Sequence, residues 1–90
     1  MKAFEITVKG KVQGVFFRAS TRDKAVELGL RGWCMNLPNG NVLIHAEGEV
    51  EKLNALLQWC KIGPTMANVS SVEYHENEVK GHLTFYIRKV

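Results

Sequence analysis

Apolar and polar side chains alternate strictly near the start of the chain, over residues 4–9, which read Phe-Glu-Ile-Thr-Val-Lys. A period of two places every second side chain on the same face of a strand, so this pattern predicts a half-buried strand that ends at Gly10. The period then lengthens, with Phe17, Thr21, Ala25 and Leu28 recurring at intervals of four, four and three. That spacing is typical of one face of a helix, and Gly29 ends it.

The middle of the chain predicts a β-hairpin and a second helix. Residues 30–36 and 42–46 are short, mostly apolar segments, and the Leu-Pro-Asn-Gly at 37–40 contains the residues that a tight turn prefers. In the next segment apolar residues return at helical spacing, at Val50, Leu53, Leu57 and Cys60. Gly63-Pro64 follows the expected end of that helix.

Two further strands are expected towards the C-terminus, around residues 69–74 and 83–88, with Leu83, Phe85 and Ile87 facing inward in the last one. The order is strand, helix, strand, strand, helix, strand, and Glu76-Asn77-Glu78 separates a final strand element. This order predicts an α+β fold: a ferredoxin-like split β-α-β sandwich (βαββαβ), in which an antiparallel sheet carries two helices on one face. Such a fold hosts many activities, so it does not by itself predict a function.

Length and composition restrict the number of domains and the class of partner only slightly. A chain of 90 residues is expected to form a single domain, residues 1–90. Twelve Lys and Arg against nine Asp and Glu leave a net charge of +3, which favours small anions weakly and is too small to indicate a nucleic-acid partner. The N-terminus alternates apolar and charged residues, and no apolar run approaches the length of a membrane span. A soluble, cytoplasmic protein without a membrane partner is therefore expected.

Residues 10–18, Gly-Lys-Val-Gln-Gly-Val-Phe-Phe-Arg, join the first predicted strand to the first predicted helix. A glycine-rich loop at a helix N-terminus can turn several backbone N–H groups towards an anion, and the helix dipole adds to the attraction. Arg18 falls in the first helical turn, where its planar guanidinium can bind two phosphate oxygens at once. The alternative is that Gly10 and Gly14 serve only the turn and that Arg18 lies in solvent.

Asn36 ends the second predicted strand, directly before the hairpin turn. Its amide offers both a donor and an acceptor, so it can orient a water molecule, although an amide is a poor base. The alternative is structural, because asparagine often begins a turn. Local chemistry alone leaves both interpretations of Asn36 open.

Two segments closely resemble the signature segments of the acylphosphatases, small enzymes that hydrolyse the carboxyl–phosphate bond of acyl phosphates. The first is the 10–18 loop, and the second is residues 32–48, Gly-Trp-Cys-Met-Asn-Leu-Pro-Asn-Gly-Asn-Val-Leu-Ile-His-Ala-Glu-Gly. The matching positions are Gly10, Val12, Gln13, Gly14, Val15, Arg18, Gly32, Trp33, Asn36, Gly40, Val42 and Gly48. The resemblance extends over essentially the whole chain, although Met35 stands where the family often has a basic residue.

The resemblance implies a catalytic pair and a binding loop. Arg18 and the backbone amides of the loop would hold the substrate phosphate, and Asn36 would position the attacking water. The implied loop residues are Lys11, Val12, Gln13, Gly14, Val15, Phe16, Phe17 and Arg18. The implied substrate is a small acyl phosphate, with inorganic phosphate as product and inhibitor. No cofactor, metal or covalent intermediate is expected, and the absence of an obvious apolar patch on the polar outer strands favours a monomer.

Other reactive residue types are weaker candidates. The histidines at positions 45, 75 and 82 are scattered through predicted strands and connections. The glutamates at 47, 49 and 51 are interpreted as a solvated strand end and helix start rather than as a metal or acid–base site. Cys34 and Cys60 lack the spacing of a zinc or redox motif, and neither precedes an arginine as in a cysteine-dependent phosphatase, so both are expected to be free thiols.

Two non-enzymatic functions remain as alternatives. A basic ferredoxin-like domain can bind single-stranded RNA on its open sheet face, but this mode needs exposed strand aromatics. Here Phe4 and Phe85 are expected to point into the core, which leaves Tyr86 as the candidate platform. The other alternative is a non-catalytic phosphate-binding module, which the loss of Arg18 or Asn36 would have indicated. Both residues are present, and this favours an enzyme.

Overall fold

The computed structural model describes residues 1–89. Its elements are, in order, β1 (Lys2–Lys11), α1 (Phe17–Glu27), β2 (Arg31–Asn36), β3 (Val42–Gly48), α2 (Val50–Cys60), β4 (Asn68–Asn77) and β5 (Phe85–Ile87). The predicted helices and strands are present, with ends that differ from the prediction by a few residues, and the order confirms the predicted α+β, ferredoxin-like fold. Over the described part of the chain, no helix has the length and apolar character that a bilayer crossing requires.

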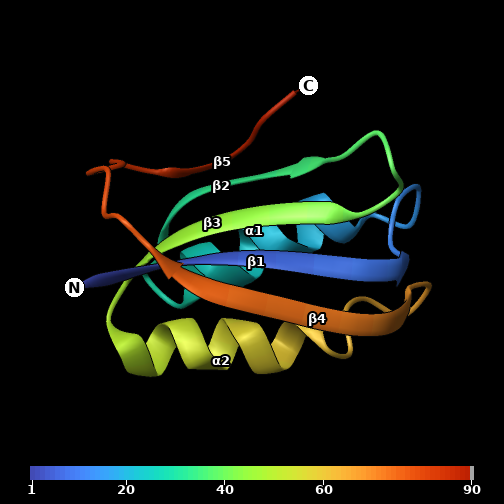
Figure 1. The fold of residues 1–90 in the computed structure, drawn as a ribbon, viewed down its shortest axis with the longest axis horizontal. Helices are drawn as coiled ribbons and strands as arrows, with labels where there is room; N and C mark the ends of the chain where they lie inside the picture. Colours follow the sequence, from blue (N-terminus) through green and yellow to red (C-terminus); the bar gives the residue numbers. More distant parts are fainter. Residues whose placement is uncertain (90) are drawn as a thin grey trace.

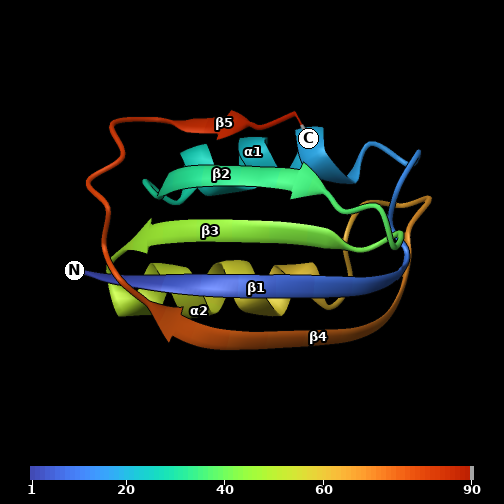
Figure 2. The same ribbon diagram turned by 45° about the horizontal axis from the view of Figure 1, so that its top comes forward.

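The strands form one five-stranded sheet in the order β4-β1-β3-β2-β5 (Figure 1). The pairs β1–β3, β1–β4 and β2–β3 are antiparallel, as predicted. β5 instead runs parallel to β2, with Phe85 opposite Gly32, so the sheet is mixed rather than wholly antiparallel. The reason is the connection after β4, which crosses the end of the sheet to the opposite edge, so that β5 enters in the direction of β2 (Figure 2).

Both helices cover the same face of the sheet, and the opposite face carries no helix from residues 1–89 (Figure 2). α1 packs on β2 and β5, whereas α2 packs on β1 and β3. The residues of β1 and α1 that the periodicity predicted for the core are buried, namely Phe4, Ile6, Val8, Phe17, Thr21 and Ala25, and Ala3 of β1 is buried as well. The core therefore lies between the sheet and the two helices.

Leu83 does not face the core, contrary to the prediction. Its side chain is 85% exposed, whereas Phe85 is buried and Ile87 packs partly buried against the core. The ladder between β2 and β5 begins only at Phe85, so Leu83 lies in the connection before the strand. Alternation directs side chains inward only within a paired strand, and the paired part of this segment begins at Phe85.

Candidate active site

The loop between β1 and α1 has an unusual backbone. Gly14 has a φ of 72° and Phe16 a φ of 62°, so two nearby residues adopt the left-handed conformation. Between them, the buried side chain of Val15 attaches the loop to the core. Within residues 1–89, the N–H groups of residues 13–18 donate no hydrogen bond to the protein. Because backbone donors are normally paired, these groups are available to a ligand.

Gly10 and Gly14 serve the path of this loop in different ways. A Cβ on Gly10 would lie 2.3 Å from the carbonyl oxygen of Asn68, so only glycine lets the end of β1 lie this close to β4. Around Gly14 there is open space, and its positive φ is what favours glycine. The two glycines therefore do serve the turn, as the structural alternative stated, and the turn leaves the loop N–H groups unpaired.

Arg18 lies in the first turn of α1. Among residues 1–89, no side chain caps the N-terminus of this helix and its first turn has no acidic residue, so this part of the chain does not cap the positive end of the helix dipole. Arg18 is half-buried and forms no ion pair with a carboxylate of residues 1–89. An unpaired guanidinium beside unpaired N–H groups is suited to an anion.

Asn36 is the last residue of β2, and it shares the sheet face of Gly32 and Cys34 because side chains alternate along a strand. Its Oδ1 atom is buried and has no hydrogen-bond partner among residues 1–89. The side chain that supports the hairpin turn is instead Asn39, whose Oδ1 accepts a hydrogen bond of 3.0 Å from the N–H of Asn41. The observed hydrogen bonds thus do not support the turn interpretation of Asn36, which presents a free acceptor.

A pocket of about 320 Å³ brings Arg18 and Asn36 together. Its wall consists of Val12, Gly14, Phe16, Phe17, Arg18, Ala19, Asn36 and Ile87. The side chains of Lys11, Gln13 and Val15, which belong to the predicted loop, do not line this wall. Ala19 and Ile87 were not among the site residues predicted from the sequence. For Ile87 there was one indication, because its side chain was expected to face inward.

Gln13 connects the loop to the β2–β3 hairpin. Its Nε2 donates hydrogen bonds to the carbonyl oxygens of Leu37, at 2.8 Å, and Asn41, at 2.9 Å. Leu37 directly follows Asn36, so these bonds hold the loop that carries Arg18 in register with Asn36. The side chain of Gln13 is therefore a positioning group, a role that the sequence pattern did not indicate.

Both cysteines are buried and free, as predicted. Burial raises the pKa of the Cys34 thiol to about 12, although Arg18 and Arg22 act in the opposite direction. Burial also raises the pKa of Cys60 to about 12. Thiols with such pKa values are not nucleophilic near neutral pH, so the structure supports their interpretation as packing residues.

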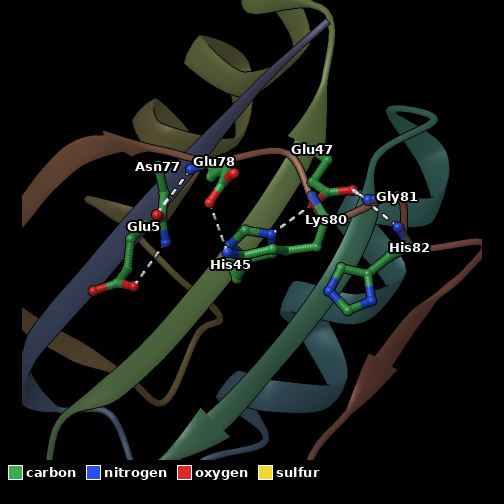
Figure 3. A network of polar contacts seen from close by, with 8 residues as sticks. All are labelled: Glu5, His45, Glu47, Asn77, Glu78, Lys80, Gly81 and His82. Carbon is green, nitrogen blue, oxygen red and sulfur yellow. Dashed lines mark hydrogen bonds and ion pairs between the residues drawn. The ribbon is translucent and has the colours of Figure 1, made fainter.

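A second polar cluster surrounds Glu47, on the helix-free face of the sheet (Figure 3). Glu47 was predicted to be solvated, and this prediction is wrong, because the side chain is only 1% exposed. Its carboxylate accepts hydrogen bonds from the N–H groups of Lys80, Gly81 and His82, and His45 Nε2 lies 2.8 Å from Glu47 Oε2. The connection from β4 to β5 supplies these backbone donors and covers the carboxylate.

The ligand atoms of His45, Glu47 and His82 lie within 4.8 Å of one another, so this cluster is the candidate metal site of the described chain. Both oxygens of Glu47 already accept hydrogen bonds, and a cation would compete with them. Burial by itself would raise the pKa of Glu47, but the hydrogen bonds from His45 and the backbone outweigh it and lower the pKa to about 2. This pairing indicates a structural carboxylate, on the face of the sheet opposite to Asn36.

Comparison with known proteins agrees with the geometry. The acylphosphatase family profile matches residues 4–87. An acylphosphatase of Methylococcus capsulatus is 49% identical over 84 residues, which cover 93% of this chain and 91% of that protein. Two solved acylphosphatases are also similar. The structure from Coxiella burnetii has a TM-score of 0.94 and 45% identity, and the match covers 97% of this chain and 92% of that one. The structure from Bacillus subtilis has a TM-score of 0.95 and 34% identity, and the match covers 98% of this chain and 99% of that one. The resemblance seen in the signature segments is thereby confirmed, and the chain belongs to the acylphosphatase family of hydrolases.

Proposed function

We propose that this chain hydrolyses the carboxyl–phosphate bond of acyl phosphates, with Arg18 and the loop amides holding the phosphate and Asn36 orienting the attacking water. Family membership supports the reaction class. One observation supports the assignment of residues: Arg18 and Asn36 line the same pocket, and within residues 1–89 the guanidinium has no carboxylate partner and the buried amide oxygen has no hydrogen bond. RNA binding on the helix-free face and a non-catalytic module are not favoured, because neither function needs Arg18 and Asn36 to line the same pocket.

The phosphate is expected to bind at the N-terminal end of α1. There the free N–H groups of the loop and the positive end of the helix dipole attract an anion, and Arg18 can donate to two of its oxygens. These donors are held in place before the substrate arrives, because Val15 and Gln13 attach the loop to the core and to the hairpin. Donors that need no rearrangement stabilise the charge of a phosphoryl group in transfer.

The water is expected to lie against Asn36, whose Oδ1 can accept one of its hydrogen bonds and direct its lone pair at the phosphorus. Attack forms a P–O bond, breaks the bond between phosphorus and the acyl oxygen, and releases a carboxylate and inorganic phosphate. A carboxylate is the conjugate base of an acid with a pKa of about 4, so it leaves without a general acid. Among the described residues, none that lines the pocket is a carboxylate or an imidazole. A phosphate oxygen of the substrate can take the proton of the water.

We further propose that residues 1–90 act as one monomeric domain in the cytoplasm, with inorganic phosphate as a product that competes for the site. Arg18 and Asn36 line one pocket within a single copy of the chain, which supports a site contained in one subunit. The two free thiols agree with a reducing compartment.

The direct test is hydrolysis of benzoyl phosphate by the purified protein in excess chelator, with a phosphate monoester as control substrate. Arg18→Ala is compared with Arg22→Ala, which removes the same charge from the next turn of α1, outside the pocket. We expect the wild type and Arg22→Ala to hydrolyse benzoyl phosphate, and Arg18→Ala to lose about 10³-fold or more in kcat, as when an arginine that stabilises phosphoryl transfer is removed. A folded wild type without activity would contradict the function, and equal losses in both variants would contradict the role of Arg18.

A further inference from the structure

Phe16 combines two features that folding alone disfavours. Among residues 1–89 it is the one non-glycine residue with a positive φ, at 62°, a conformation that is strained for a residue with a Cβ atom. Its side chain is also 80% exposed, so burial of the ring does not compensate for the strain. When a strained conformation persists without such compensation, a functional reason is a reasonable hypothesis.

The neighbouring Phe17 shows how a packing phenylalanine behaves in the same segment. It is 1% exposed, and its ring centroid lies 5.6 Å from that of Trp59. Phe16 has no aromatic partner of this kind among the described residues. Asparagine or glycine would adopt the same backbone conformation with less strain and would not expose an aromatic ring to water.

The position of Phe16 supplies the functional reason. Phe16 belongs to the wall of the pocket that contains Arg18 and Asn36, and Ile87 of β5 adds a second apolar residue to that wall. The pocket thus combines polar groups that suit a phosphate with apolar groups that have no role in holding one. An acyl phosphate has the matching division, because a charged phosphate is joined to a carbon substituent.

We propose that Phe16, together with Ile87, forms the subsite for the acyl group, and that the enzyme favours acyl phosphates with an aromatic or bulky apolar acyl group. The inference rests on the proposed function, because a phosphate bound at Arg18 is what locates the acyl group. Contact with Phe16 removes apolar surface of both partners from water, and two aromatic rings attract each other in addition. An acetyl group has too little apolar surface to gain as much from the same contact.

The test compares kcat/KM for benzoyl phosphate and acetyl phosphate in three proteins: the wild type, Phe16→Asn and Leu83→Asn. Asparagine tolerates the left-handed conformation, so Phe16→Asn keeps the backbone and removes the ring. Leu83 is equally exposed but lies outside the pocket, which makes Leu83→Asn the matched control. We expect the benzoyl-to-acetyl ratio to fall about tenfold in Phe16→Asn, the size of one lost aromatic contact, and to stay constant in Leu83→Asn.

An unchanged ratio in folded Phe16→Asn would overturn the subsite while both substrates were still hydrolysed, so it would leave the proposed function intact. A wild type that hydrolysed neither substrate would overturn both. A second measurement does not depend on turnover: phenylphosphonate and methylphosphonate are titrated into each protein, with Phe16→Gly in place of the asparagine variant if that variant does not fold. The wild type is expected to bind phenylphosphonate more tightly, and retention of that preference without the Phe16 ring would contradict the proposal.

Discussion

The two polar clusters of this protein differ in how completely their groups are paired. On the helix-free face, the carboxylate of Glu47 accepts hydrogen bonds from three consecutive backbone N–H groups and lies in contact with His45. At the pocket, Asn36 Oδ1 has no partner among residues 1–89. Structural polar groups in a folded protein are normally satisfied, because a buried group without a partner costs roughly 1–3 kcal/mol. The comparison therefore separates a cluster that holds the fold together from one that is left open for a ligand.

Asn36→Ala tests the pocket, where the polar group has no partner, and is expected to have the largest effect of these variants, on kcat. Loss of one preorganised polar group from a transition state costs about 2.7–4 kcal/mol, or 10²–10³ in kcat. The free energy of unfolding should not fall, because the Oδ1 atom has no hydrogen bond to lose. Activity assays and urea unfolding measure the two effects.

Asn39→Ala is the control for that experiment, because it removes a hydrogen bond within the turn and leaves the pocket intact. We expect it to lower stability and to leave kcat nearly unchanged. If Asn36→Ala instead unfolded the protein while Asn39→Ala did not, Asn36 would be a structural residue.

The pH dependence of stability tests the cluster around Glu47, whose polar groups are paired. The pKa of Glu47 is lowered from 4.5 to about 2, since hydrogen bonds to the ionised form outweigh its burial. Because the folded pKa is the lower one, this stabilisation is complete above the unfolded pKa and disappears as the pH falls towards the folded pKa. The free energy of unfolding is expected to fall by about 3 kcal/mol when Glu47 is fully protonated, because protonation and folding are linked. Urea unfolding between about pH 6 and pH 2 measures it.

Two glutamine variants sharpen that measurement. Glu47→Gln removes the titrating group, so its stability should depend less on pH over the same range. Glu49→Gln changes an exposed neighbour and should keep the wild-type dependence. Identical pH profiles in all three proteins would show that Glu47 does not carry the effect.

Gln13→Ala tests the link between the loop and the hairpin. Two hydrogen bonds to carbonyl oxygens are lost, so the free energy of unfolding should fall by about 1–2 kcal/mol. A looser register between Arg18 and Asn36 should also lower kcat, by up to about 10²-fold. Gln58→Ala, on the exposed side of α2, is the matched control and should change neither value. Lower stability with normal kcat would mean that the hairpin keeps its place without Gln13.

Phe16→Gly is expected to have the smallest effect, and in the opposite direction. It relieves the strain of a positive φ, while glycine adds some conformational entropy to the unfolded chain. The net result should be a gain of about 0.5–1 kcal/mol, visible as a higher urea midpoint at an unchanged m value. A lower midpoint would show that the ring contributes to packing after all.

Periodicity predicted the layers of the fold well where an element buries one face, as β1 and α1 do. It correctly placed Phe17 and Ile87 on the inner side, for example. The errors at Leu83 and Glu47 have one physical cause, namely the connection between β4 and β5. A hydrogen bond from the N–H of Lys80 joins Glu47 to a residue 33 positions later, and no local pattern reports such a contact.

The candidate site was predictable as a set of residue types but not as a geometry. A strand, a glycine-containing loop and a helix start made Arg18 a candidate, and the end of a strand made Asn36 one. The structural alternatives stayed open for both residues until the resemblance to the acylphosphatases implied their roles. The missing partner of Asn36 Oδ1, the bonds of Gln13 and the backbone of Phe16 depend on how distant segments pack. For Phe16 there was a particular obstacle, because phenylalanine rarely adopts a positive φ and so gives no local signal for it.

The strand order also has a consequence for how quickly the molecule folds. Among the strands of residues 1–89, β2 and β3 alone are neighbours both along the chain and in the sheet. β1 must find β3 and β4, and β2 must find β5, across long intervening segments whose closure costs entropy before any contact is gained. Proteins dominated by such pairings fold in milliseconds to seconds rather than microseconds. The loop that contains Gln13 starts from β1 and is held by the hairpin, so we expect the pocket to be among the last parts of the molecule to form.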